Sequence, residues 1–212
     1  AGRRVGYPQF KAKKRDIPSF KATNNKGTVA IVGHSIRLPK IGYVDCRISK
    51  QVNGEILSAT VQQAKSGKYY VAINCKNVDL PSMPATGSVV GFDLGLKDLA
   101  ITSDGEKYDN PHTYAKNQKK LARLQRQLSR KTKGSHNREK AKLRVARLHE
   151  KIANQRNVAL HKMTTKLVRE NDVICMENLS VKNLVKNRKL VKSIMDASWG
   201  EVRRQLAYKT VW

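Results

Sequence analysis

Apolar and polar residues alternate over short distances in the first third of the chain. Runs rich in β-branched and aromatic residues recur between turn-forming residues, which is typical of strands; they span 29–33, 35–39, 43–49, 56–63 and 68–75. Short Gly-containing segments, Gln51–Gly54 and Lys65–Lys68, separate the last three runs, so we expect an antiparallel hairpin at each. The pattern predicts a compact antiparallel β-barrel or sandwich.

The chain changes character near residue 87. Residues 79–87 carry two prolines and a glycine and are typical of a linker. After them, apolar runs at 88–93, 99–102 and 106–108 predict a three-strand meander of short strands. We therefore expect one domain over residues 1–86 and a second over 87–212.

A helical pattern follows the meander. Apolar residues three and four positions apart predict amphipathic helices; they are Leu121, Leu124, Leu128, Val145, Leu148, Ile152, Leu160, Met163 and Leu167. A break at 131–137 indicates two long helices that form a hairpin over about 114–170. Another apolar strand is predicted at 172–177, and Ser198 and Glu201 have the spacing of a capping box that starts a last helix. The expected fold class is α+β or α/β.

Charge points to the partner. The 212 residues hold 43 Lys or Arg against 16 Asp or Glu, a net charge of +27. Between Tyr114 and Glu170 there are 18 Lys or Arg and three Glu, a net charge of +15. A charged run is usually only a solvated face, but repulsion at this density destabilises the hairpin unless a polyanion binds it. Nucleic acid is the favoured partner.

Cysteine usage and hydropathy restrict the compartment. Cys46, Cys75 and Cys175 are far apart and form no CxxC pair, so neither a disulfide framework nor a cysteine zinc site is predicted. No apolar stretch has the length of a membrane span, and we expect no membrane partner. These features favour a reducing compartment inside the cell.

Two carboxylates are candidate catalytic groups. Asp93 and Glu177 each end an apolar strand, and on neighbouring parallel strands they would converge. A buried carboxylate must be paired, protonated or bound to a metal, and carboxylates around two Mg²⁺ ions are what two-metal phosphodiester cleavage needs. Gly91 and Gly95 would allow a close approach of backbone or phosphate. Taken singly, either carboxylate could instead cap a helix or pair with an arginine.

Basic residues next to aromatic ones are candidate nucleic-acid contacts. Residues 6–15 interleave cations with two aromatic rings, which can stack a base and hold a phosphate; the alternative is that the rings belong to the core. The candidates over the whole chain are Tyr7, Phe10, Lys11, Lys13, Lys14, Arg15, Lys119, Lys120, Arg123, Arg126, Arg130, Lys131, Lys133, Arg138, Lys182, Lys186 and Arg188.

Seven stretches of the chain form a set of motifs that is specific when taken together: Gly6–Lys11, Leu38–Gly42, Gly91–Ala100, Ser103–Gly105, Lys119–Arg130, Glu177–Leu179 and Asp196–Gly200. This set resembles the transposon-encoded OrfB/TnpB family of RNA-guided DNA endonucleases, which are related to type V CRISPR effectors and were long called transposases. The likeness covers essentially the whole chain.

The resemblance implies a fold and a site. Residues 1–86 match the family's β-barrel wedge domain, which contacts nucleic acid, and residues 87–212 match an RNase H-type, RuvC-like nuclease domain. Asp93 matches its first catalytic carboxylate and Glu177 its second. The implied cofactor is Mg²⁺, and the implied partners are guide RNA made from the transposon end, target DNA and their RNA–DNA heteroduplex. The family also implies the bacterial cytoplasm, in association with the nucleoid.

The family pattern extends beyond both ends of this sequence. It has further residues before the wedge motif, and after the last helix a zinc ribbon and a third catalytic aspartate. We therefore expect an incomplete RuvC-like site without zinc, with weak metal binding and slow or absent cleavage. Two alternatives stay open: an inactive RNA-guided DNA-binding protein that acts as a repressor or decoy, and a generic basic RNA-binding protein.

Overall fold

A computed structural model describes residues 17–78 and 83–211, and the chain divides into two compact units, residues 1–79 and 80–212. Helices and strands are both present, so the fold is mixed α and β, as predicted. None of the described helices combines the length and apolar character needed to cross a membrane.

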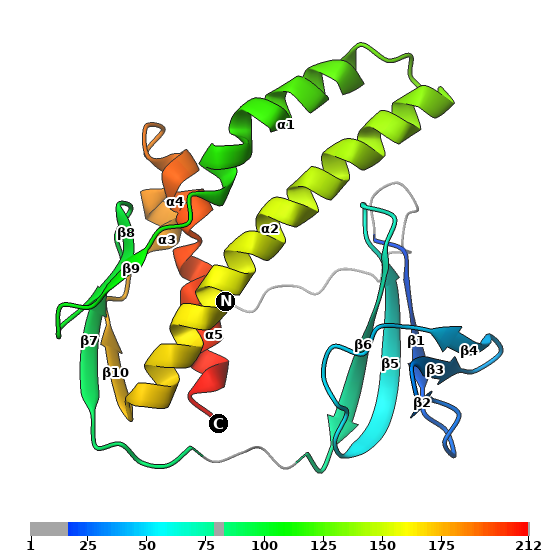
Figure 1. Ribbon diagram of the computed structural model, residues 1–212, viewed down its shortest axis with the longest axis horizontal. Helices are drawn as coiled ribbons and strands as arrows, with labels where there is room; N and C mark the ends of the chain where they lie inside the picture. Colours follow the sequence, from blue (N-terminus) through cyan, green and yellow to red (C-terminus); the bar gives the residue numbers. More distant parts are fainter. Residues whose placement is uncertain (1–16, 79–82, 212) are drawn as a thin grey trace, which may run out of the picture. The chain divides into compact units, whose positions relative to one another are not determined.

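The first unit contains two three-stranded antiparallel sheets (Figure 1). One has the order β1-β5-β6, and the other has the order β2-β3-β4. The strands are β1 Ser19–Thr23, β2 Ala30–Val32, β3 Ser35–Leu38, β4 Gly42–Asp45, β5 Glu55–Gln63 and β6 Tyr69–Lys76. Their core is aliphatic, formed by Val29, Ile36, Leu38 and Ala59. Among the described residues the strands do not close into a barrel.

Only one of the two predicted hairpins in this unit forms. The turn after β5 is tight: the amide of Gly67 donates to the carbonyl of Ala64, and Gly67 has a φ of 84°, which favours glycine. The hairpin predicted at Gln51–Gly54 is wrong, because β4 pairs with β3 whereas β5 pairs with β1 and β6. Residues 46–54 instead cross from one sheet to the other.

The second unit is built on a four-stranded sheet of order β10-β7-β8-β9. Strands β7 (Val89–Asp93), β8 (Asp98–Thr102) and β9 (Lys107–Asp109) form the predicted antiparallel meander, and β10 (Val173–Met176) joins β7 in parallel. The linker end is tied to this sheet, since both carboxylate oxygens of Asp172 accept from the amide of Thr86.

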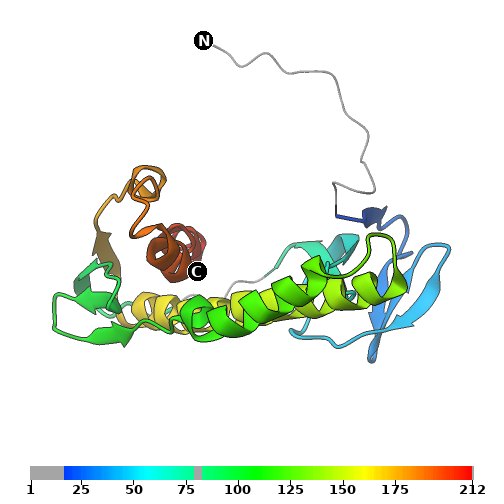
Figure 2. The ribbon, with the colours of Figure 1, turned by 90° about the horizontal axis from the view of Figure 1, so that it is seen from above.

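Two long helices separate the meander from β10. Helix α1 spans Thr113–Ser129 and α2 spans His136–Glu170, and Figures 1 and 2 show them side by side. Their apolar positions serve two cores. Leu121, Leu148 and Ile152 pack between the helices, whereas residues 160–167 of α2 pack on the sheet. The second half of α2 therefore belongs to the body of the unit.

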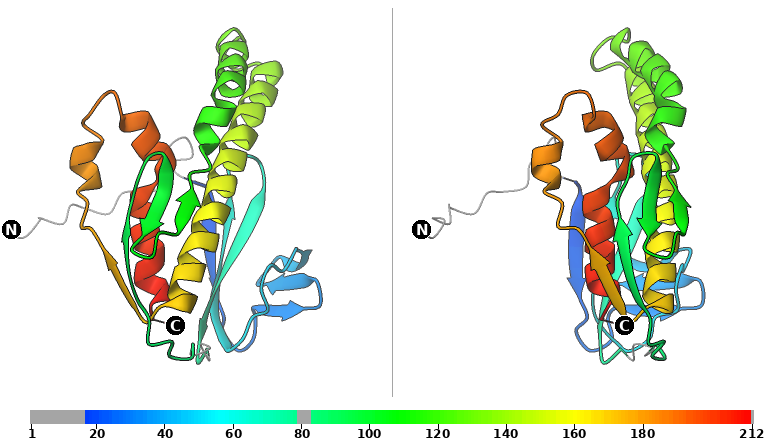
Figure 3. Two further views of the ribbon diagram at one scale, coloured as in Figure 1. Left: turned by 60° about the vertical axis from the view of Figure 1, so that its left-hand side comes forward. Right: turned by 90° about the vertical axis from the view of Figure 1, so that its left-hand side faces the viewer.

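Three shorter helices complete the unit: α3 (Val181–Leu184), α4 (Val191–Ala197) and α5 (Trp199–Lys209). Figure 3 shows α5 and α2 together behind β10 and β7. The buried ammonium of Lys209 joins the two helices by donating to the hydroxyls of Thr164 and Thr165, both at 2.7 Å, and burial lowers its pKa.

The capping box predicted for α5 is wrong. Ser198 precedes the helix but has a left-handed backbone with φ 54°, and its hydroxyl donates to the carbonyl of Met195 instead of accepting from the helix. The Glu201 carboxylate accepts from Arg204 and Gln205 further along α5. The spacing therefore located the start of the helix correctly. The Glu201 carboxylate, however, bonds to Arg204 and Gln205 within the helix and not to the backbone at Ser198.

Candidate functional site

Asp93 and Glu177 lie at the carboxyl ends of two neighbouring strands of the four-stranded sheet. Asp93 is the last residue of β7 and Glu177 directly follows β10. The strands are parallel and Met176 stands opposite Phe92, so each carboxylate is the next residue along its own strand. Carboxyl ends of neighbouring parallel strands are where open α/β sheets bind ligands.

The expectation that these two carboxylates are buried is wrong. Both residues are exposed. Side chains alternate along a strand: Phe92 and Met176 belong to the core, and the next residues on both strands face the other way. Burial therefore gives no reason for a bound metal here. The argument for a metal site depends instead on the neighbouring ends of the two parallel strands.

The loop after Asp93 is held in place by the body of the unit. The indole nitrogen of Trp199 donates to the carbonyl of Gly95 at 3.3 Å, and the buried Asn110 side chain donates to the carbonyl of Leu96 at 2.8 Å. A β-carbon on Gly95 would lie 2.7 Å from the carbonyl oxygen of Asp98, so only glycine fits. These contacts hold the backbone of the loop that directly follows Asp93 in one position.

The donor set suits a hard divalent cation. Mg²⁺ prefers oxygen ligands and is usually bound by one or two carboxylates, with water and phosphate filling the other positions. Asp93 and Glu177 supply two such groups. Among the described residues no group of three or more His, Cys, Asp or Glu side chains is arranged to hold a metal.

Cations follow Glu177 along the chain. Lys182, Lys186 and Arg188 are exposed on α3 and the loop after it. Next to Glu177, the Asn178 side chain accepts from the guanidinium of Arg203 on α5 at 2.7 Å. A polyanion that reached the strand ends would meet these positive charges.

The hairpin displays most of its predicted cations to solvent. The exposed ones are Lys119, Lys120, Arg123, Arg126, Arg130, Lys131 and Lys133. Arg138 is half-buried and has a structural role, since its guanidinium donates to the carbonyls of Leu128 and Lys131 and closes the turn. The predicted contacts Tyr7, Phe10, Lys11, Lys13, Lys14 and Arg15 lie outside the described residues.

The tip of the hairpin forms a basic hollow of about 490 Å³ between the end of α1 and the start of α2. Arg130 and Lys131 line it from one side, and Lys140 and Arg144 line it from the other. Sequence reasoning missed the second pair. Their spacing of four residues, which places them on one face of a helix, was the signal available in the sequence. That this face lies opposite Arg130 and Lys131 appears only in the fold.

Asp196 is a second residue whose role sequence reasoning missed. It is 5% exposed and caps α1 from a distance: Thr113 donates its hydroxyl to the carboxylate at 3.0 Å and Tyr114 its amide at 2.9 Å. Arg156 of α2 lies 3.9 Å from the same carboxylate. The residue that precedes α1, His112, provides no side-chain cap. Asp196 therefore fixes the start of the hairpin on the body of the unit.

The chain is similar to known proteins of one family. The profile of the OrfB_IS605 family, described as "Probable transposase", matches residues 62–188, more than half of the chain. A "Putative RNA-guided DNA endonuclease" of Streptomyces pristinaespiralis is 38% identical over 99% of this chain and 52% of its own length. "Putative RNA-guided DNA endonuclease InsQ" of Escherichia coli is 40% identical over 99% of this chain and 55% of its own length.

Among solved structures, the cryo-EM structure of a Cas12f1–sgRNA–target DNA complex matches with a TM-score of 0.46 and 13% identity, over 73% of this chain and 34% of that one. The chain spans about half the length of the curated relatives that it matches. The family predicted from the motifs is confirmed. The chain belongs to the OrfB_IS605 family of transposon-encoded proteins.

Proposed function

We propose that this chain carries two of the catalytic carboxylates and part of the nucleic-acid surface of an RNA-guided DNA endonuclease with a RuvC-like, RNase H-type nuclease domain. The observation that supports this most is the placement of Asp93 and Glu177 at the carboxyl ends of the adjacent parallel strands β7 and β10. The names of the curated relatives support the same class of activity.

In this proposal Asp93 and Glu177 hold Mg²⁺. Bound there, two Mg²⁺ ions would supply an activated water and charge stabilisation for phosphodiester hydrolysis. The two carboxylates are exposed on one side of the sheet edge, so a DNA backbone can approach them from solvent. The loop at Gly95, which Trp199 holds in place, keeps the Asp93 carboxylate at the carboxyl end of β7.

The hairpin binds guide RNA and target DNA in this proposal. Its exposed cations neutralise phosphates without reading sequence, and the release of counterions makes such binding strongly salt-dependent. Sequence choice is delegated to guide pairing in proteins of this kind. Asp196 fixes the hairpin to the unit that carries the carboxylates, so the nucleic acid and the site keep a defined relation within this unit.

Metal binding tests the carboxylate assignment. Mn²⁺, a spectroscopic substitute for Mg²⁺, is titrated into the purified chain and followed by electron paramagnetic resonance. Asp93→Asn and Glu177→Gln should each weaken Mn²⁺ binding at least about tenfold, because each removes one charged ligand. Asp109→Asn is the matched control, since Asp109 is exposed on β9 at the far edge of the same sheet. Equal losses in all three variants would contradict the assignment.

Cleavage separates an enzyme from a binding protein. With guide RNA, matched DNA and Mg²⁺, we expect slow or absent cutting by this chain and complete loss in Asp93→Asn, with RNA affinity nearly unchanged. Cutting as fast as that of a relative of full length would overturn the weak-site expectation. Guide-dependent binding of matched DNA by a chain that binds no Mn²⁺ would favour the repressor or decoy function.

A further inference from the structure

In the described part of the first unit the aromatic side chains are exposed. The four aromatic residues between Ile17 and Val78 are Phe20, Tyr43, Tyr69 and Tyr70, and they are 45%, 62%, 69% and 42% exposed. Aromatic side chains usually dominate a core because each buries a large area. Here the described core is aliphatic, so these four rings stand on the surface, where a ligand can reach them.

Strand register puts two of these rings on one face of a sheet. Phe20 stands opposite Val61, and Tyr69 stands opposite Gln63, two residues further along β5. Residues two apart on a strand share a face, so Phe20 and Tyr69 lie on the same side. Tyr70, the next residue, lies on the other side.

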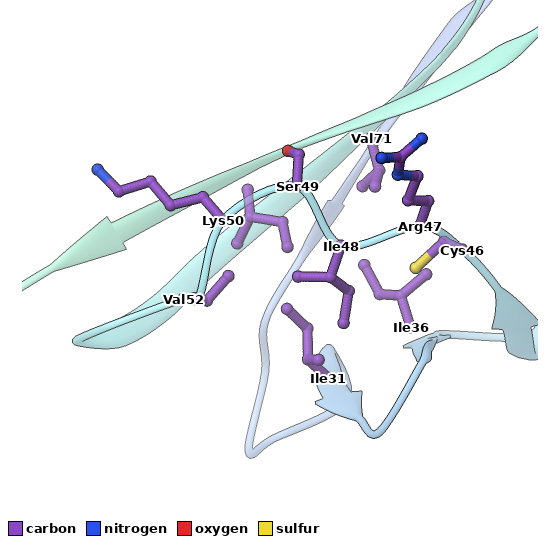
Figure 4. Close-up of a pocket in the computed structure, with 10 residues that line it drawn as sticks. Ile31, Ile36, Cys46, Arg47, Ile48, Ser49, Lys50, Val52 and Val71 are labelled. Atoms are coloured by element: carbon purple, nitrogen blue, oxygen red, sulfur yellow. The ribbon is translucent and has the colours of Figure 1, made fainter.

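The same face leads into an apolar cavity. Along β6, Tyr69 is followed on this face by Val71 and Ile73, which line a cavity of about 170 Å³. Figure 4 shows the side chains of Ile31, Ile36 and Ile48 pointing toward one another in it. A dry cavity of about 150 Å³ binds benzene, so this one has room for a single ring and not for a base pair.

The mouth of the cavity is positively charged. Arg47 and Lys50, both exposed, come from the segment that crosses between the sheets, and in Figure 4 their side chains extend away from the isoleucines. None of the ten lining residues is acidic. Ser49 adds a hydroxyl at the same place. The cavity has apolar walls beneath two cations, and Tyr69 lies two residues from the lining residue Val71 on the same face of β6. This combination matches the chemistry of a base attached to phosphate.

We propose that this face binds a short unpaired stretch of nucleic acid, with one base stacked on Tyr69 and a neighbouring base inserted in the cavity. Arg47 and Lys50 hold the phosphates, and the polar edge of the inserted base stays at the mouth beside Ser49. The proposal rests on the proposed function only in that the chain binds nucleic acid. The family resemblance implies that this unit contacts nucleic acid; the proposal adds the particular residues and a site for unpaired bases.

Neighbouring tyrosines give a matched test. Fluorescence anisotropy of a labelled 12-nucleotide pyrimidine strand, as RNA and as DNA, measures the affinity of the 212-residue chain. Stacking on an aromatic side chain changes affinity roughly 5- to 150-fold on alanine substitution, so Tyr69→Ala should weaken binding within this range and Tyr69→Phe should retain it. Tyr70→Ala, one residue away on the other face, should change it less than about twofold. The stronger of the RNA and DNA strands identifies the natural ligand.

Two results would overturn the proposal. One is an unchanged affinity in Tyr69→Ala, and the other is an equal loss in Tyr70→Ala. A dimer that dissociates in Tyr69→Ala would assign the face to a second copy instead. Thermal melting of each variant shows whether it folds.

Photo-crosslinking keeps the test independent of folding in the variants. A 5-iodouracil strand bound to the unmodified chain should crosslink within residues 46–52 or 69–73, as mapped by mass spectrometry. Crosslinks confined to the hairpin would refute this site while leaving the proposed function intact. A chain that binds no nucleic acid at all would refute the proposed function itself.

Discussion

The two ends of the helical hairpin use their cations differently. Near the sheet, Arg156 faces the buried Asp196, and Lys166 pairs with Glu106 and lies 3.9 Å from Glu170. At the tip, Lys142 lies 3.7 Å from Glu139, but the four cations that line the hollow, Arg130, Lys131, Lys140 and Arg144, have no ion-pair partner within the described residues. Paired cations contribute to the fold, whereas unpaired ones repel one another until an external anion binds.

This contrast separates cations that contribute to the fold from cations that stay available to a polyanion on a uniformly basic surface. A count of charges gives +15 for the whole hairpin and does not separate its ends. The ion pairs do separate them. Glu106 and Asp196 contact cations in the part of the hairpin near the sheet, whereas Glu139 at the tip pairs with Lys142, which does not line the hollow. The tip hollow is therefore the part of the hairpin where an external anion would relieve the most repulsion.

The largest effect is expected from two double variants of equal charge. Lys140→Ala with Arg144→Ala empties one wall of the tip hollow, and Lys166→Ala with Arg204→Ala removes two cations that pair with Glu106 and Glu201. Each phosphate contact contributes about 0.7 to 0.9 to the salt slope. At 0.1 M salt the tip variant should lose roughly 25- to 60-fold in affinity for nucleic acid.

The second double variant should lose less than about threefold, because charges away from the contact are screened. Titrations at several salt concentrations measure both quantities, and the slope of the tip variant should fall by about 1.5. The tip variant should also melt at a higher temperature than the unmodified chain, since repulsion is relieved. Equal losses of affinity in the two variants would remove the distinction between the ends.

A large effect on stability is expected at the base. Asp196→Ala removes the cap of α1 and leaves Arg156 facing no charge, which should cost about 2–4 kcal/mol of unfolding free energy. Asp196→Asn keeps an acceptor for the α1 amides and should lose less. Urea unfolding followed by circular dichroism measures both, and an unchanged midpoint in the alanine variant would show that Asp196 does not hold the helix.

The sequence predicted the parts that depend on local patterns. Apolar spacing located the meander and the two long helices, and strand ends located Asp93 and Glu177. What it missed depends on contacts between distant residues. Asp196 reaches α1 from 83 residues away, and the exposure of the two carboxylates follows from which face of the sheet the helices cover.

The wrong predictions have the same origin. A Gly-containing segment between β4 and β5 favours a hairpin, but β5 pairs instead with β6 and with β1. The spacing of Ser198 and Glu201 favours a capping box, but Arg204 competes for the glutamate one turn along the helix. In each case a tertiary or neighbouring contact displaced the local preference.

An effect confined to acid pH is expected at α5. Hydrogen bonds from Arg204 lower the pKa of Glu201 from its usual 4.5 to about 2. The unfolded chain therefore binds this proton at higher pH than the folded chain, so the stabilisation is complete above pH 4.5 and is lost as the pH falls toward 2. Melting temperatures are measured from pH 2 to 6. At pH 6 the unmodified chain should melt at a higher temperature than Glu201→Gln, and at pH 2 the two melting temperatures should converge. A constant difference would contradict the assignment.

The smallest effect is expected for the pair of Lys166 and Glu106. Both side chains are more than 40% exposed, so solvent screens their attraction and ordering two flexible chains offsets much of it. A double-mutant cycle with Glu106→Gln and Lys166→Met should give a small stabilising coupling at 0.05 M salt that disappears at 0.5 M. Lys162→Met, one turn away on α2, is the control for loss of a cation. A coupling that persists in high salt would mean that the ends of the hairpin differ more than their exposure implies, because even the exposed cations at the base would then be committed to the fold.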